Sequence, residues 1–178
     1  MIAPLPIPTH LRDCVAPVDQ SAEEGWLRVS VRCPCGETRF ELGYPGQTHD
    51  WGGREIPCFA QIGQHHFFLL SARCAGCDRD HLLLDADFHG WDGFVCHDPE
   101  KAALPRPPLV PWACRECAGI SHSGVITVQV ESKELVLGEG EIGIDPERWY
   151  DAFGWFSMDL SCAQCGREEP ELISCETA

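Results

Sequence analysis

The chain has 178 residues, enough for one ordinary domain or two small ones, and its 44% apolar and 23% charged residues are typical of globular proteins. This composition excludes a collagen, a coiled coil and a disordered chain, and the 14 prolines and 17 glycines indicate many turns and few long helices. Two features depart from the average: 12 cysteines and a formal net charge of −15.

The negative charge bears on the class of partner. It is shared by both parts of the chain rather than confined to a tail. A nucleic acid would meet a surface of its own sign, without the phosphate neutralisation that supplies most non-specific binding. We therefore expect no nucleic-acid partner, and a basic protein is the expected partner.

The N-terminal residues and the longest uncharged stretch bear on the compartment. The first ten residues lack the basic region and the apolar run of a signal peptide, and residues 56–72 contain too many polar side chains to span a bilayer. These features predict a cytoplasmic protein with no membrane contact. In that reducing compartment, clustered cysteines more often bind metal than form disulfides.

Strand patterns flank the early cysteines. Residues 1–24 are predicted to form an N-terminal arm, with at most one helical turn at 19–24. Apolar and polar residues alternate at 27–31 and 40–42, and further strands are predicted at 66–72, 81–86 and 124–131.

The later part of the chain carries two further signals. Residues 134–137 and 141–144 are predicted to form a hairpin around the glycines at 138 and 140. Asp145, Pro146 and Glu147 are typical of a helix start, so a helix is predicted over residues 145–153, with its aromatic side chains packed on a sheet.

Eight of the cysteines fall in four close pairs. The first and third pairs start 81 residues apart and the second and fourth 88 apart, which indicates two similar halves. Five prolines at residues 98–112 predict an extended connector between them. The expected organisation is an arm (1–24), a first half (25–98), a connector (99–111) and a second half (112–178). The pairs are Cys33 and Cys35, Cys74 and Cys77, Cys114 and Cys117, and Cys162 and Cys165, which leaves Cys14, Cys58, Cys96 and Cys175 without an assigned role.

The spacing within a pair favours metal binding. Two cysteines separated by two residues can turn both sulfurs toward one tetrahedral ion, and a glycine after the second, such as Gly166, allows a positive φ. Cys33 and Cys35 have a single residue between them, a tighter spacing that leaves their geometry open. The paired turns and their strand flanks resemble the zinc-ribbon class over about half the chain. This resemblance implies a mainly β fold with two zinc-ribbon-like antiparallel halves and one short helix.

Two schemes for sharing the ions stay open. In chain order, the first two pairs hold one ion and the last two pairs hold another; in the competing scheme the two middle pairs share an ion. Two zinc ions per chain are expected, although four thiolates suit iron as well. Buried thiols or disulfides are the alternative without metal. Six arginines beside the turns either screen the thiolates or are ordinary surface charges: Arg32, Arg39, Arg73, Arg79, Arg115 and Arg167.

One loop carries other candidate chemistry. Residues 85–98 place acids, histidines and aromatic side chains between glycines, and the candidate ligand or partner residues are His89, Trp91, Asp92, Cys96 and His97. Catalysis or a third metal site would require these groups to converge; the alternative is a capped turn whose aromatic residues pack in the core. No P-loop, G-x-S-x-G, H-E-x-x-H or dinucleotide motif is present, so no catalytic residue is assigned.

The expected function is therefore a non-catalytic, zinc-stabilised acidic module that binds a basic protein. Candidate partners range from a transcription or translation factor to a toxin neutralised by an acidic immunity protein. Two alternatives remain: a metal-dependent enzyme that uses the loop from His89 to Asp98, and a zinc-ribbon accessory protein of nucleic acids. The pattern leaves the oligomeric state open.

Overall fold

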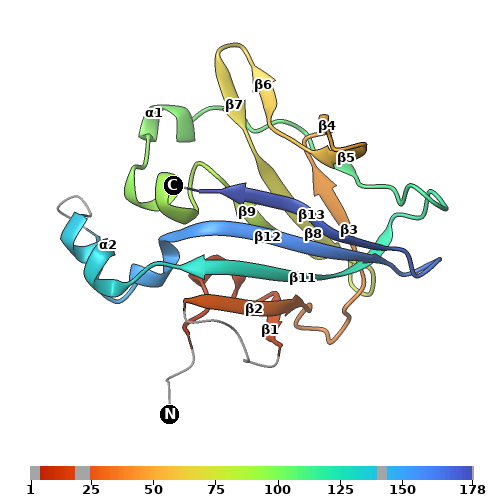
Figure 1. Ribbon diagram of the computed structural model, residues 1–178, viewed down its shortest axis with the longest axis horizontal. Coiled ribbons are helices and arrows are strands. Elements are labelled where there is room, and N and C mark those ends of the chain that lie inside the picture. The colour runs from red at the N-terminus through yellow and green to blue at the C-terminus, as the bar shows by residue number, and fades with distance from the viewer. Residues whose placement is uncertain (1–4, 19–24, 140–143, 178) are drawn as a thin grey trace.

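The computed structural model describes residues 5–18, 25–139 and 144–177, and it is mainly β and antiparallel, as the sequence predicts (Figure 1). One sheet contains most of the strands. Its main path is β1 (Val15–Pro17), β2 (Trp26–Val31), β11 (Ser121–Val130), β3 (Phe40–Tyr44), β8 (Leu69–Cys74) and β9 (Asp80–Asp85). In addition, β12 (Phe153–Cys162) pairs with β11 and with β13 (Glu168–Glu176), and β10 (Val110–Pro111) pairs with β3.

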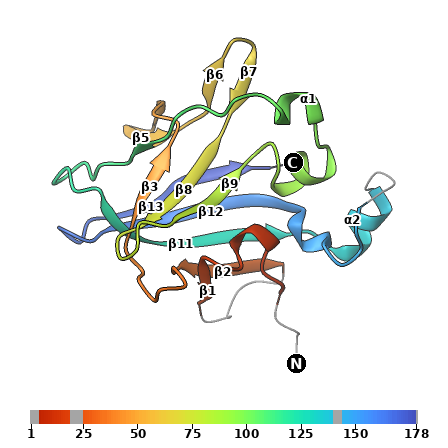
Figure 2. The ribbon, with the colours of Figure 1, turned by 180° about the vertical axis from the view of Figure 1, so that it is seen from behind.

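Strand β11 is the centre of this sheet. One side of β11 pairs with β12, while the other side pairs with β2 at residues 125–129 and with β3 at Ser121 and His122. The sheet divides at this point, and β3 and β8 cross the direction of β11–β13 in both ribbon views (Figures 1 and 2). Strands from before and after the proline-rich connector therefore alternate in one continuous sheet.

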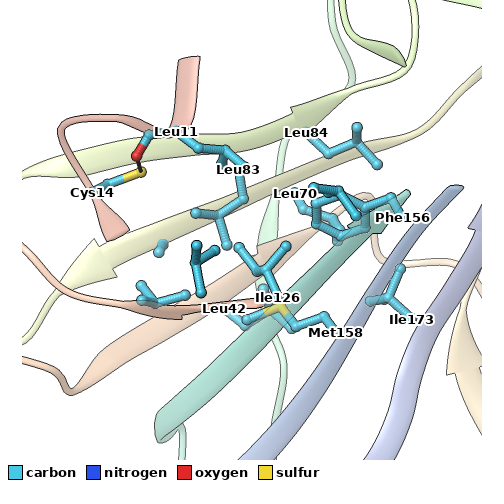
Figure 3. Close-up of a cluster of buried hydrophobic side chains, with 14 of the residues drawn as sticks. Leu11, Cys14, Leu42, Leu70, Leu83, Leu84, Ile126, Phe156, Met158 and Ile173 are labelled. Atoms are coloured by element: carbon cyan, nitrogen blue, oxygen red, sulfur yellow. Dashed lines mark hydrogen bonds between the residues drawn. The ribbon is translucent and has the colours of Figure 1, made fainter. Parts of the chain in front are cut away.

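The core fills the space between the crossing parts of the sheet. Leu42 and Leu70 come from one part, Ile126, Phe156 and Met158 come from the other, and all five are fully buried (Figure 3). Their burial follows from the alternation along each strand, which directs every second side chain inward. Each such side chain contributes about 1.5–3 kcal/mol when it leaves water.

The N-terminal residues and the connector both contact this body. Within the predicted arm, the 3₁₀ turn η1 (Thr9–Leu11) brings Leu11 into the core with no exposed surface, and β1 pairs with β2. Residues 19–24 lie outside the described residues. The connector contains the short helix α1 (Pro99–Ala102), capped by the Asp98 carboxylate, and it ends in β10.

Two short hairpins lie between β3 and β8. They are β4 (Thr48–Trp51) with β5 (Arg54–Pro57), and β6 (Ala60–Ile62) with β7 (His65–Phe67). The predicted strand at 66–72 is thus divided between β7 and β8, while the other predicted strands correspond to β2, β3, β9 and β11.

The prediction of a hairpin at residues 134–144 is wrong. The helix α2 (Lys133–Glu139) occupies its first strand, since the Ser132 hydroxyl accepts the Leu135 N–H and Val136 is fully buried. The Ser132 cap and the burial of Val136 favour a helix over a strand at these residues. Residues 141–143 of the second predicted strand lie outside the described residues.

The prediction of a helix over residues 145–153 is also wrong. Asp145 accepts the N–H of Glu147 as expected, but only the 3₁₀ turn η3 (Trp149–Asp151) follows, and Phe153 already begins β12. Pairing of β12 with β11 prevails because it places Phe153 and Phe156 in the core, where they have no exposed surface. The predicted packing of the aromatic side chains against a sheet is confirmed for Tyr150 and Phe153.

Candidate metal centres

The four cysteine turns lie at one end of the sheet. Cys74 ends β8 and Cys162 ends β12, and a row of directly opposed residues joins them across four strands. The row runs from Cys74 to Phe40, from Phe40 to His122, and from His122 to Cys162. Directly opposed residues of an antiparallel pair point to the same face.

Three turns have the same backbone geometry. The N–H of the first cysteine donates to the carbonyl five residues later, as in Cys74 to Arg79 at 2.9 Å, and its own carbonyl accepts the N–H four residues later. The residue after the second cysteine has a positive φ in each case: 57° at Asp78, 58° at Ala118 and 73° at Gly166. The glycine expected in this role is present in only one of these three turns.

The turn at Cys33 is a shortened version. The Cys33 N–H donates to the carbonyl of Glu37 at 2.9 Å, and the Gly36 N–H donates to the carbonyl of Cys33 at 2.8 Å. Each bond spans one residue fewer than in the other turns, as the single residue between Cys33 and Cys35 requires. The positive φ now falls on Gly36, at 94°. The tight spacing therefore still aims both sulfurs at one point.

The cysteines gather in two groups of four, in the chain-order scheme. The atoms Cys33 Sγ and Cys77 Sγ lie 3.5 Å apart, as do Cys35 Sγ and Cys74 Sγ. In the second group, Cys114 with Cys165 and Cys117 with Cys162 are each 3.6 Å apart. The scheme in which the middle two pairs share an ion is wrong.

These separations fit a metal ion better than a disulfide. Four sulfurs at about 2.3 Å from one tetrahedral ion lie roughly 3.8 Å apart, whereas a disulfide brings them to about 2.05 Å. All eight cysteines are free thiols, and all ligand atoms within a group lie within 4.8 Å of one another. Each group could hold one metal ion, with four thiolates closing the coordination and leaving no position for a substrate.

Backbone amides stabilise the thiolate form at one cysteine of each group, Cys74 and Cys162. Burial raises the pKa of Cys74, but the N–H groups of Gly76 and Cys77, together with hydrogen bonds from the thiols of Cys35 and Cys33, outweigh it and hold this pKa at about 7. The same balance, with the N–H groups of Cys165 and Gln164, holds the pKa of Cys162 at about 7. Metal binding requires deprotonated thiols, so these amides favour a loaded site.

Two histidines near the groups of four cysteines were not predicted from the sequence. His81 Nε2 lies 3.3 Å from Cys33 Sγ, so its N–H can donate to that thiolate and orient it. His122 is 1% exposed, lies opposite Cys162, and has no hydrogen-bond partner for either ring nitrogen in the described part of the chain. Neither has a spacing signal, because strand pairing rather than chain order brings them to the cysteines.

Most of the nearby arginines pair with carboxylates. Arg39 pairs with Glu37, Arg73 with Asp78, Arg115 with Glu169, and Arg167 with Glu116 and Glu169. For these four arginines, the contacts favour ordinary ion pairs over screening of the thiolates.

The loop of residues 85–98 does not bring its candidates to one point. His89 and His97 line a cavity of about 550 Å³, whereas Asp92 and Cys96 line a different cavity of about 300 Å³. Trp91 is partly buried in a small apolar cluster around Val95, Val136 and Ala152. Of the remaining cysteines, Cys14 donates from its buried thiol to the Leu11 carbonyl, and Cys58, Cys96 and Cys175 belong to neither group of four.

Comparison of the chain with models of known protein families, with curated proteins and with solved structures found no match. None of the helices in the described ranges has the length and apolar character that crossing a bilayer requires.

Proposed function

We propose that this chain is a non-catalytic protein whose fold is held by two zinc ions, one in each zinc-ribbon-like half, and that it binds a basic protein. The observation that carries the metal part is the pair of four-cysteine groups, in each of which the ligand atoms lie within 4.8 Å of one another. Zinc is the ion most often held by four thiolates in closed structural sites. Iron is the competing ion, and a thiolate-bound iron would colour the protein.

An acid-lined cavity supports the choice of a basic partner. This cavity, of about 300 Å³, has Phe59, Phe68 and Cys175 among its apolar lining, and its exposed carboxylates include Asp92 and Glu176. The cavity's Lys101 already pairs with the buried Asp87. A lysine or arginine side chain from a partner would place its stem on the apolar lining and its charge beside the free carboxylates.

Elemental analysis tests the metal part. Protein purified without chelator should contain close to two zinc ions per chain. Colourless protein with this content supports the proposal, whereas metal near zero with eight or more titratable thiols, or two irons per chain, contradicts it.

Charge-neutral variants test the partner part. A basic protein recovered with the chain from its native host should bind the double variant Asp92→Asn/Glu176→Gln at least tenfold more weakly than the parent. The control Glu134→Gln/Glu147→Gln removes the same charge from exposed residues that do not line this cavity. Equal weakening by both variants would show only a general charge effect and would contradict a role for the cavity.

A further inference from the structure

The cavity on the other side of the 85–98 loop has a different chemistry. Its volume is about 550 Å³, within the range of small-molecule sites, and residues from three distant segments form it. They come from η1, from β9 with the loop that follows it, and from η3. Three histidines and one arginine lie here: His10, His89, His97 and Arg148. They stand together in a protein with a net charge of −15.

Two of these histidines form a fixed stack. The rings of His10 and His89 are nearly parallel, with centroids 3.6 Å apart. His10 Nε2 lies 3.1 Å from the Leu83 carbonyl, to which it donates, and His89 Nδ1 accepts the Asp85 N–H at 2.9 Å. Each backbone bond sets the tautomer, so His89 carries its proton on Nε2 and His10 keeps a lone pair on Nδ1.

Arg148 and Asp151 both line the cavity and form an ion pair. The Arg148 Nε and one terminal nitrogen lie 2.8 Å from Asp151 Oδ2, and the other terminal nitrogen is free of this pair. Asp151 is buried, and its second oxygen accepts the Thr9 N–H. The acid is therefore occupied on both oxygens, while Arg148, about half exposed, and the Nε2–H of His89 can still donate to a ligand.

The walls beside these donors are apolar and aromatic. Phe94 lies under the Arg148 guanidinium, with 5.0 Å from the guanidinium carbon to the ring centroid, and Phe88 and Leu82 also line the cavity. Both Phe88 and Leu82 are 42% exposed, which is a large fraction for apolar side chains. A planar apolar group would cover this surface while an oxyanion reached the donors.

The protonation of the histidines agrees with this arrangement. Burial lowers the pKa of His10 to about 4 and that of His89 to about 3, so both rings are neutral at pH 7. The charged groups beside the stack are Arg148, the N-cap of η3, and Asp151, its last residue, and His97 is the third histidine among the described residues that line the cavity. At pH 7 the cavity therefore holds two neutral, stacked histidine rings beside the Arg148–Asp151 ion pair, whose second terminal arginine nitrogen stays available to a ligand.

We propose that this cavity binds a small organic oxyanion, a carboxylate or phosphate attached to a planar apolar body, through Arg148 and the Nε2–H of His89. The site is independent of the basic partner proposed above and of the two groups of four cysteines. It uses the face of the loop that carries His89, Gly93 and His97, and leaves the face with Asp92 and Cys96 to the acid-lined cavity.

The test uses 1-naphthoate as the probe and its neutral isostere 1-naphthamide as the control. Long-range ¹H–¹⁵N spectra of the full metal-loaded protein report the histidine rings. We expect 1-naphthoate to shift the signals of His89 and His10 with saturation in the millimolar range or below, and 1-naphthamide to bind at least tenfold more weakly. Equal binding of the two probes would overturn the proposal. So would the absence of a shift in the signals of either ring at ten times the 1-naphthoate concentration that is expected to saturate the site.

A matched pair of variants at the exposed rim separates binding from folding. Leu82→Glu places a carboxylate beside the cavity and should weaken 1-naphthoate binding about tenfold, while Leu82→Lys should preserve or tighten it. Both changes affect a half-exposed side chain and should leave the thermal midpoint close to that of the parent. Identical affinities of the two variants would show that the probe binds elsewhere and would contradict the assignment.

Discussion

Gly93 lies in the loop between the two cavities, at a position where the backbone leaves no room for a side chain. A Cβ at this position would lie 2.5 Å from the Phe88 nitrogen and 2.7 Å from the Ala86 oxygen, both of which are backbone atoms that cannot rotate away. Gly93→Ala should therefore destabilise the protein by about 1–3 kcal/mol. Gly138→Ala is the control, since nothing lies within 4 Å of its added methyl group. Urea denaturation measures both, and an equal effect of the two changes would contradict the close packing of the loop.

The stacked histidines predict a dependence of stability on pH. Burial lowers the folded-state pKa of His10 to about 4, whereas in the unfolded chain it is about 6.5. Between these values the unfolded chain binds a proton that the folded chain does not, so this contribution is complete above pH 6.5 and is lost as the pH falls toward 4. At pH 5 the loss is on the order of 2 kcal/mol.

The variant His10→Gln keeps a donor for the Leu83 carbonyl and removes the titration. Its unfolding free energy should fall less than that of the parent between pH 7 and pH 5. The comparison cancels the acid sensitivity of the cysteine groups, which both proteins share. Parallel losses in parent and variant would contradict a buried neutral His10.

Cysteine spacing predicted the residues of the two groups of four thiols because it constrains local turn geometry. Cys162 and Cys165 aim their sulfurs through bonds within one turn, and the neighbouring residues suffice to recognise this. His81 and His122 could not be predicted in the same way, since each reaches a cysteine only through strand pairing. The cavity residues His10 and Arg148 carry no local sequence signal for one another either, because they are 138 positions apart along the chain.

At the scale of elements, the central row of the sheet joins the two metal groups. Cys74, Phe40, His122 and Cys162 are consecutive partners across β8, β3, β11 and β12. Loss of one ion should therefore loosen the strands that carry the other. Cys165→Ser should abolish the second site and also speed the release of metal from the first site to a chelator.

The control for this prediction is Cys175→Ser, which changes a partly buried cysteine outside both groups. A structural zinc contributes on the order of 10 kcal/mol to folding, so Cys165→Ser should unfold far more readily than the control. Thermal unfolding with metal quantitation checks both statements. Equal thermal shifts would contradict the ligand assignment, and parent-like release from the first site would show that the groups are independent.

Among the elements, short-range alternation predicted β2 and β3, because the apolar face of each is buried. It could not predict the hairpin of β4 and β5, most of whose residues are exposed or half-buried and lack an apolar pattern. The start of β12 was assigned to a helix from its capping signal at Asp145. The alternation of Phe156, Met158 and Leu160 would have indicated the strand, and pairing with β11 decides between the two.

For the whole molecule, loading the metal groups increases the negative charge. Eight thiolates and two divalent ions change the formal charge by −4, from −15 to −19. Charge of one sign steers an oppositely charged partner from a distance and repels a polyanion. The metal-loaded form should therefore be the one that discriminates most strongly between a basic protein and a nucleic acid.

The last prediction follows from this charge and concerns ionic strength. Association with the basic partner should weaken as the Debye length falls from about 10 Å at 0.1 M salt to about 3 Å at 1 M. Labelled duplex and single-stranded oligonucleotides should show no measurable binding at about 0.15 M salt, because the phosphates find no compensating cationic surface. Fluorescence anisotropy of both oligonucleotides beside the recovered partner makes the comparison on one protein preparation. Tight, salt-sensitive oligonucleotide binding would mean that the arginines near the cysteine turns outweigh the total charge, and would favour a nucleic-acid accessory protein instead.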